Sequence, residues 1–228
     1  MRKKVLVALA AVILFIVLIC AVFYFTRPAV AFVTSSSFPP GYELPEPGNI
    51  LKYRMTAPEN ADLVITAPDA ALPDNTNTYL FGREAEEGEN PVAVLQIDEG
   101  RMWESALSLE NSVVLFEESD PYAKEIFSHL SEVRPELDSV TYSGRVSVAN
   151  LDALKASLAN AENVLVLTPI SSMELLRSDH DWNAVLDVRD SAAMETTDIS
   201  YAVSIDWDST IENLLSGKAE LSYTLLTL

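Results

Sequence analysis

Carboxylate and hydroxyl side chains follow several apolar runs of this chain, and one such group is dense enough to do chemistry. Glu117, Glu118, Ser119 and Asp120 come directly after the apolar run 113–116. Neighbouring carboxylates can act as general acid and base or hold a cation. Their spacing is not that of a calcium-binding loop, and no companion cluster accompanies them. We therefore expect this group to bind a ligand or cap a helix rather than to catalyse a reaction.

Other catalytic patterns are missing from the sequence. Asp179, His180 and Asp181 resemble a base with its orienting group, but adjacent residues of one loop rarely converge on a single point. The chain has no glycine-rich phosphate loop and no nucleophile elbow. With Cys20 as its one cysteine and only two histidines, it cannot form a Cys/His zinc site. We expect no catalytic residue, no cofactor and no metal, and hence a protein that is not an enzyme.

The elements that must position these side chains are short apolar strands alternating with amphipathic helices. This alternation is typical of an α/β fold with a doubly wound, mostly parallel sheet. Asp120 is placed to cap the helix that follows it, and Pro121 suits the first turn of that helix. The pattern predicts strands at 29–34, 61–68, 78–82, 91–98, 112–116, 140–142, 163–169, 184–188, 201–205 and 221–226, and helices at 101–109, 121–137, 150–161, 171–176 and 209–215.

In open α/β sheets, ligands bind beyond the carboxyl ends of the strands, near the point where the strand order reverses. That rule nominates polar side chains that follow the predicted strands, together with one tryptophan beside them. Serine and aspartate at such turns are also the usual helix caps, so both interpretations stay open. The nominated ligand-binding residues are Ser35, Ser36, Asp98, Glu117, Ser119, Thr168, Asp206 and Trp207.

The N-terminal segment predicts a membrane anchor. Three cations at positions 2–4 precede an unbroken apolar run over residues 5–25, long enough to cross a bilayer core. The cations favour a cytoplasmic N-terminus, which places the main domain on the extracytoplasmic side. Two alternatives remain: cleavage after a signal peptide near residues 29–31, and lipidation at Cys20. We expect a single-pass protein of the cell membrane.

Charge sets limits on the partners. Residues 27–228 hold 12 basic and 34 acidic residues, a net charge of −22. Such a surface repels nucleic acid and anionic lipid headgroups, so we expect no nucleic-acid partner. The acids are dispersed along the chain, which is typical of a solubilising surface. The exported part has no cysteine, so its stability must come from a packed core.

Three passages of the second half resemble the C-terminal lobe of type I periplasmic binding proteins, the family that also supplies the sensor domains of LacI-like repressors. They are residues 112–130, 140–176 and 199–215, and they match that lobe in the order and spacing of strands, helices and ligand loops. The resemblance implies ligand contacts at Glu117 and Asp206. Residues 29–110 are too short and too rich in proline for the usual N-terminal lobe. Either that lobe is shortened, or the chain forms a single flavodoxin-like domain.

We therefore expect three regions: a cytoplasmic tip and anchor at 1–27, a reduced N-terminal lobe at 28–110 and an α/β C-terminal lobe at 111–228. The favoured function is that of a membrane-anchored, extracytoplasmic solute-binding-like protein of the bacterial cell envelope, which recognises a small polar ligand without chemistry. The alternative is an envelope interaction or scaffold protein that has kept the fold and lost the ligand. In that case the proline-rich segment 38–48 would contact a protein partner.

Overall fold

The computed structural model describes residues 2–34, 52–74, 77–191 and 199–228, and their contacts divide the chain into two compact units. The first unit holds the described residues up to Leu95, together with Ile211–Ala219. The second holds Gln96–Thr210 and Glu220–Leu228 without its undescribed segment. In the described part, the chain thus passes between the units three times. Residues 96–110, which the sequence grouped with the N-terminal lobe, belong to the second unit.

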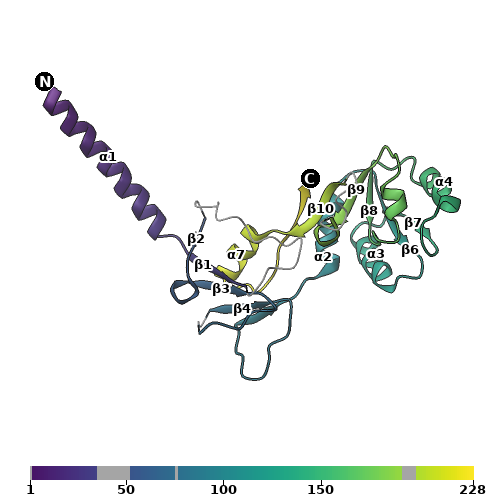
Figure 1. Ribbon diagram of the computed structural model, residues 1–228, viewed down its shortest axis with the longest axis horizontal. Coiled ribbons are helices and arrows are strands. Elements are labelled where there is room, and N and C mark those ends of the chain that lie inside the picture. Colours follow the sequence, from purple (N-terminus) through teal and green to yellow (C-terminus); the bar gives the residue numbers. More distant parts are fainter. Residues whose placement is uncertain (1, 35–51, 75–76, 192–198) are drawn as a thin grey trace. The chain divides into compact units, whose positions relative to one another are not determined.

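The N-terminal segment forms helix α1 (Arg2–Phe25), as its apolar composition predicts (Figure 1). Within the described part of the chain, no helix combines the length and the apolar character that crossing a membrane requires.

The first unit is built on a five-stranded sheet in the order β2-β1-β3-β4-β5, in which every neighbouring pair is parallel. Its central strands are largely buried on both faces, as expected for a parallel sheet. A 3-10 turn, Pro58–Asn60, precedes the third strand. The strands are β1 (Ala29–Val33), β2 (Arg54–Met55), β3 (Leu63–Thr66), β4 (Thr78–Phe81) and β5 (Ala93–Leu95).

The connections of this sheet differ from those of an ordinary parallel sheet, which are usually helical. Their described residues between β3 and β4, and between β4 and β5, form turns and no helix. Arg83 holds the second of these loops: its Nε donates to the carbonyl of Pro68 at 2.9 Å, and its two terminal nitrogens donate to Glu89 at 2.6 and 2.7 Å. This pairing lowers the pKa of Glu89 to about 2. Arg83 therefore ties this acidic loop to the segment after β3.

The second unit is built on a six-stranded sheet in the order β11-β10-β9-β8-β6-β7. All pairs are parallel except β10 with β11, which is antiparallel. The predicted mostly parallel α/β fold is confirmed, but in two sheets rather than one. The strands are β6 (Ser112–Glu117), β7 (Asp138–Tyr142), β8 (Asn163–Val166), β9 (Asn183–Asp187), β10 (Ile199–Ile205) and β11 (Tyr223–Thr227).

Helices cover both faces of the second sheet, so its side chains alternate between two apolar cores. Val114 and Phe116 point into one core with α2 (Glu99–Glu104) and α3 (Pro121–Val133). Leu115 points into the other core, with residues of α4 (Val148–Ser157) and α5 (Met173–Leu176). Two further helices follow β9 and β10, namely α6 (Val188–Ser191) and α7 (Trp207–Leu215). The doubly wound arrangement is thus realised in this unit.

Several predicted helix ends were wrong, for local reasons. The helix predicted at 121–137 ends at Val133, because Pro135 disfavours helical backbone in the residue before it. The helix predicted at 150–161 begins at Val148, where Ser147 and Asn150 form a capping box, and ends at Ser157. The helix predicted at 101–109 begins at Glu99, and a 3-10 turn (Ser105–Ser108) follows it.

Candidate functional site

The strand order of the second sheet has one point of reversal, at β6. The strands that follow β6 in the chain lie on its two sides, β7 on one and β8 on the other. The connection from β6 to β7 and the connection from β7 to β8 therefore run in opposite directions across the sheet. In open α/β sheets that geometry opens a crevice outside the carboxyl ends of the strands, where ligands bind.

Glu117 ends β6 at this point and is held by two partners. The hydroxyl of Ser119 donates to both carboxylate oxygens, at 2.7 and 2.8 Å. The backbone N–H of Gly144, in the turn after β7, donates to Oε1 at 3.1 Å. The Gly144 backbone has a φ of 68°, a conformation in which glycine is favoured. The carboxylate is therefore fixed in position by two neighbouring loops of the sheet.

Hydroxyl groups adjoin Glu117 on the side of β8. The backbone N–H of Glu117 donates to Thr168 Oγ1 at 2.9 Å, and the Tyr142 hydroxyl lies 3.0 Å from the same oxygen. Tyr142 also lies 2.8 Å from the hydroxyl of Ser172, which donates to the carbonyl of Thr168 at 2.7 Å. The switch-point cluster is the set of Glu117, Ser119, Tyr142, Gly144, Thr168 and Ser172.

The electrostatics of the cluster give it one charge. The Ser119 hydroxyl, with the Gly144 N–H, lowers the pKa of Glu117 from its usual value. Burial raises the pKa of Tyr142. At neutral pH the cluster thus presents one carboxylate with its negative charge and a neutral phenol.

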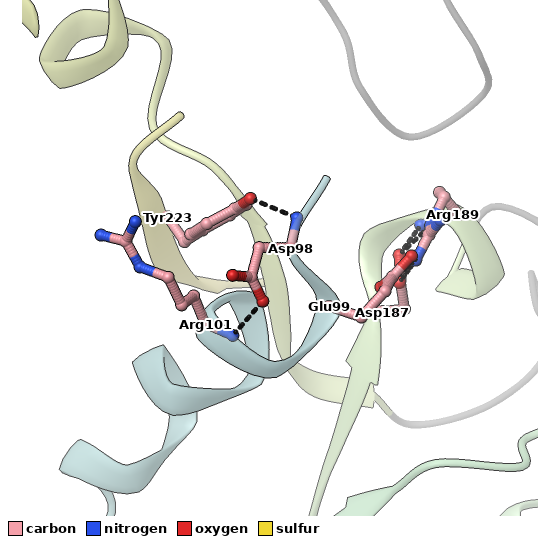
Figure 2. A network of polar contacts seen from close by, with 6 residues as sticks. All are labelled: Asp98, Glu99, Arg101, Asp187, Arg189 and Tyr223. Carbon is pink, nitrogen blue, oxygen red and sulfur yellow. Dashed lines mark hydrogen bonds and ion pairs between the residues drawn. The ribbon is translucent and has the colours of Figure 1, made fainter. Parts of the chain in front are cut away.

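A second polar group lies at the end of β9, where Arg189 joins two carboxylates (Figure 2). Asp187 is 4% exposed and accepts from the Arg189 backbone N–H at 2.8 Å and from its Nε at 2.9 Å. Nη2 of the same guanidinium donates to both oxygens of Glu99, at 2.9 and 2.7 Å. This arginine bridge (Glu99, Asp187 and Arg189) ties the start of α2 to the sheet. Burial, with the charge of Asp187, raises the pKa of the neighbouring Asp190.

Two nominated aspartates cap helices. Asp98 accepts from the backbone N–H of Arg101 at 3.1 Å, as the N-cap of α2, and its own N–H donates to the Tyr223 hydroxyl (Figure 2). Asp206 accepts from the backbone N–H and the hydroxyl of Ser209 in the first turn of α7, at 3.1 and 2.6 Å. Their carboxylates therefore serve the helices directly.

The remaining nominated residues divide into two groups. Glu117, Ser119 and Thr168 come together in the switch-point cluster. Trp207 is 5% exposed, so its ring lies in the interior. Ser35 and Ser36 lie outside the described residues, as does the proline-rich segment 38–48.

Sequence reasoning missed half of the switch-point cluster. Tyr142 and Gly144 stand at the end of β7, where the carboxyl-end rule applies equally, so that rule could have found them. Ser172 lies in the turn before α5, a position where serine usually caps a helix, so its residue type alone does not indicate a site. Nothing in the sequence joins Glu99 to Arg189, because their contact spans distant segments of the chain. Among the described residues, no group of three or more His, Cys, Asp or Glu side chains is placed to hold a metal ion.

Comparison with known proteins gives the following likenesses. No protein-family model and no curated protein matches the chain. Among solved structures, it is similar to an ABC transporter solute-binding protein from Conexibacter woesei, with 11% identity, a TM-score of 0.40 and 89% of each chain covered. It is similar to the arabinose-binding protein AraP from Geobacillus stearothermophilus, with 14% identity, a TM-score of 0.38, and 88% and 97% covered. A LacI family regulator from Enterococcus faecium with bound ribose has 14% identity, a TM-score of 0.35, and 87% and 97% covered. These neighbours are type I periplasmic binding and LacI-type proteins.

Proposed function

We propose that the chain binds a small polar ligand at the switch-point cluster, without chemistry. The observation that carries this proposal is the Glu117 carboxylate, which two loops fix where the strand order reverses. A carboxylate fixed before the ligand arrives loses little conformational entropy on binding.

The chemistry of the cluster defines the ligand class. Each oxygen of a carboxylate can accept two hydrogen bonds. Oε2 of Glu117 accepts only from Ser119 among the described residues, so it retains capacity for a ligand donor. Ser119 and Glu118 beside it are exposed. The ligand we propose therefore presents hydroxyl or ammonium donors to Glu117.

The experiment is a ligand panel on the full chain, purified in a mild detergent. Sugars, nucleosides, amino acids and divalent cations are each tested for a rise in the thermal midpoint. A ligand that binds only the folded chain stabilises it by about 2.7 kcal/mol at a hundredfold excess over its Kd. Glu117→Gln should abolish the rise. Glu118→Gln, a matched change at the exposed neighbour, should keep it. If every ligand that raises the midpoint of the natural chain also raises that of Glu117→Gln, the proposal is contradicted.

A second candidate function, that of an envelope interaction protein, is favoured by two exposed apolar side chains on neighbouring segments. Val148, the first residue of α4, is 84% exposed, and Ile170, in the turn after β8, is 75% exposed. A hydrogen bond from the Val146 N–H to the Ser171 carbonyl, at 3.0 Å, joins the segments beside them. Isolated apolar side chains are common on protein surfaces, so the pair is weaker support than a fixed carboxylate. Two results together would favour this function. No ligand of the panel raises the thermal midpoint, and a protein that binds the natural chain fails to bind the double variant Val148→Ser with Ile170→Ser.

We also propose that residues 5–25 anchor the chain in a membrane, with the main part on the extracytoplasmic side. The support is the uncharged apolar run and the three cations before it. Protease added to intact cells whose outer layers have been removed should digest the part after residue 28 and spare the N-terminus. Recovery of the whole chain in the fraction released by alkaline carbonate would contradict the anchor.

A further inference from the structure

A cavity of about 320 Å³ lies in the second unit, between the start of α2 and one face of α3. The lining residues on α3 recur every three or four positions, so they lie on one face of that helix. The lining residues on the α2 side are consecutive in the chain, at positions 97–100. None of the lining residues belongs to the switch-point cluster, so a ligand here goes beyond the function proposed above. The lining residues are Ile97, Asp98, Glu99, Gly100, Tyr122, Glu125, Ile126 and His129.

The cavity keeps negative charge that the protein does not neutralise. Of its three carboxylates, Glu99 is paired with Arg189 at 2.7 Å. His129 is paired with Glu104 outside the lining, at 2.6 Å. Among the described residues, no basic side chain lies within salt-bridge distance of Asp98 or Glu125. Two acidic residues without a salt-bridge partner among the described residues therefore line a space large enough for a ligand.

The rest of the lining is apolar and aromatic. Ile126 is buried and Ile97 is half-buried. Tyr122 is 44% exposed, and burial together with the charge of Glu99 raises its pKa, so the phenol stays neutral. The face of a neutral aromatic ring attracts a cation.

We propose that this cavity binds a small organic cation, an ammonium group on a compact apolar body. The ammonium group pairs with Asp98 and Glu125, and the apolar body packs against Ile97 and Ile126 under the ring of Tyr122. The volume limits the ligand to a small one, because ligand sites of drug-sized molecules span about 300–1,000 Å³. Asp98 keeps its capping bond through Oδ1, which leaves Oδ2 for the ligand (Figure 2).

Three molecules of one shape and different charge test this proposal: benzylamine, benzyl alcohol and benzoate. Each is titrated calorimetrically into the full chain in detergent, with empty micelles as the blank. We expect benzylamine to bind with a Kd on the order of 1 mM, and the neutral and anionic molecules at least about tenfold more weakly. Equal binding of all three, or no binding of benzylamine up to about 10 mM, would overturn the proposal.

Two glutamates of α3 provide a matched pair of variants. Glu125→Gln removes an exposed charge from the cavity and should weaken benzylamine binding by about fivefold or more. Glu132→Gln makes the same change on the same helix outside the lining and should leave the Kd unchanged. Because both positions are exposed, both variants should fold, which far-UV circular dichroism checks. If the two variants weakened benzylamine binding equally, the cause would be the general charge of the chain, and the proposed site would be wrong.

Discussion

Glu117 is the residue on which the candidate site depends. It ends β6, it accepts from a hydroxyl and a backbone N–H, and its own N–H donates to Thr168. Asp206 directly follows β10 and Asp98 lies three residues after β5, but their carboxylates accept from the first turns of helices. The same residue types at equivalent places in the sequence thus have different roles. The difference lies in which backbone N–H groups face each carboxylate.

The titration of Glu117 gives a prediction at this scale. Its pKa is lowered in the folded chain, so the charged form is the one that stabilises. This contribution is fully present above the ordinary glutamate pKa of about 4.3 and is lost as the pH falls through the lowered folded pKa. We expect the difference in thermal midpoint between the natural chain and Glu117→Gln to be constant near neutral pH and to shrink in acid. A difference that is independent of pH would contradict the assigned contacts.

At the scale of elements, helix caps place the side chains of the second unit. Asp120 accepts from the backbone N–H groups of Tyr122 and Ala123 at 3.0 and 3.3 Å, as its sequence position before Pro121 predicts. Asp120→Ala should destabilise the chain by about 1 kcal/mol, measured by urea unfolding. Asp120→Asn keeps an accepting oxygen, so its loss of stability should be much smaller. Equal losses in the two variants would mean that charge rather than capping is responsible.

The approach of α2 to α3 gives a second prediction for the elements. A Cβ atom added at Gly100 would lie 2.8 Å from Cδ2 and 2.9 Å from Cγ of His129, closer than packed atoms allow. Gly100→Ala should therefore destabilise the chain by about 1–3 kcal/mol. His129→Ala in the same chain should recover part of that loss, since it removes the clashing ring. A double-mutant cycle measures this coupling, and additive effects would contradict the contact.

Most strands and helices could be predicted from the sequence, because the hydrophobic periodicity that specifies each element lies within that element. The apolar run 112–116 and the stripe of apolar residues in α3 each specify an element without reference to the rest of the chain. Two lobes were expected, but the placement of residues 211–219 in the first unit was not predictable, because a local pattern does not indicate which unit an element joins. The hydroxyl groups of Tyr142 and Ser172 lie 2.8 Å apart although the residues are 30 positions apart in the chain, and no local sequence pattern encodes such a contact.

At the scale of the whole molecule, the chain is divided between two units that are not continuous in sequence. Ile211–Ala219 belongs to the first unit, although it follows most of the second along the chain. A boundary placed at one position, such as residue 110, cannot describe such a division. The interleaved path also means that neither unit can be cut out as a single segment.

The overall charge leads to a prediction at this scale. The chain has a net charge of −19, and its acids are dispersed. Repulsion among like charges opposes the compact state, and salt screens it. We therefore expect the thermal midpoint of the full chain to rise as sodium chloride increases from about 0.02 to about 0.5 M. A falling midpoint would show that favourable ion pairs, such as Arg83 with Glu89, outweigh the repulsion.

The central claim is that Glu117 fixes a small polar ligand at the switch point of the second sheet. The most direct test is the thermal midpoint of the full chain against the ligand panel, with Glu117→Gln and Glu118→Gln in parallel. We predict that at least one ligand with hydroxyl or ammonium donors raises the midpoint of the natural chain and of Glu118→Gln, but not that of Glu117→Gln. No rise with any ligand in a well-folded chain, or a panel in which Glu117→Gln retains every rise, would contradict the account.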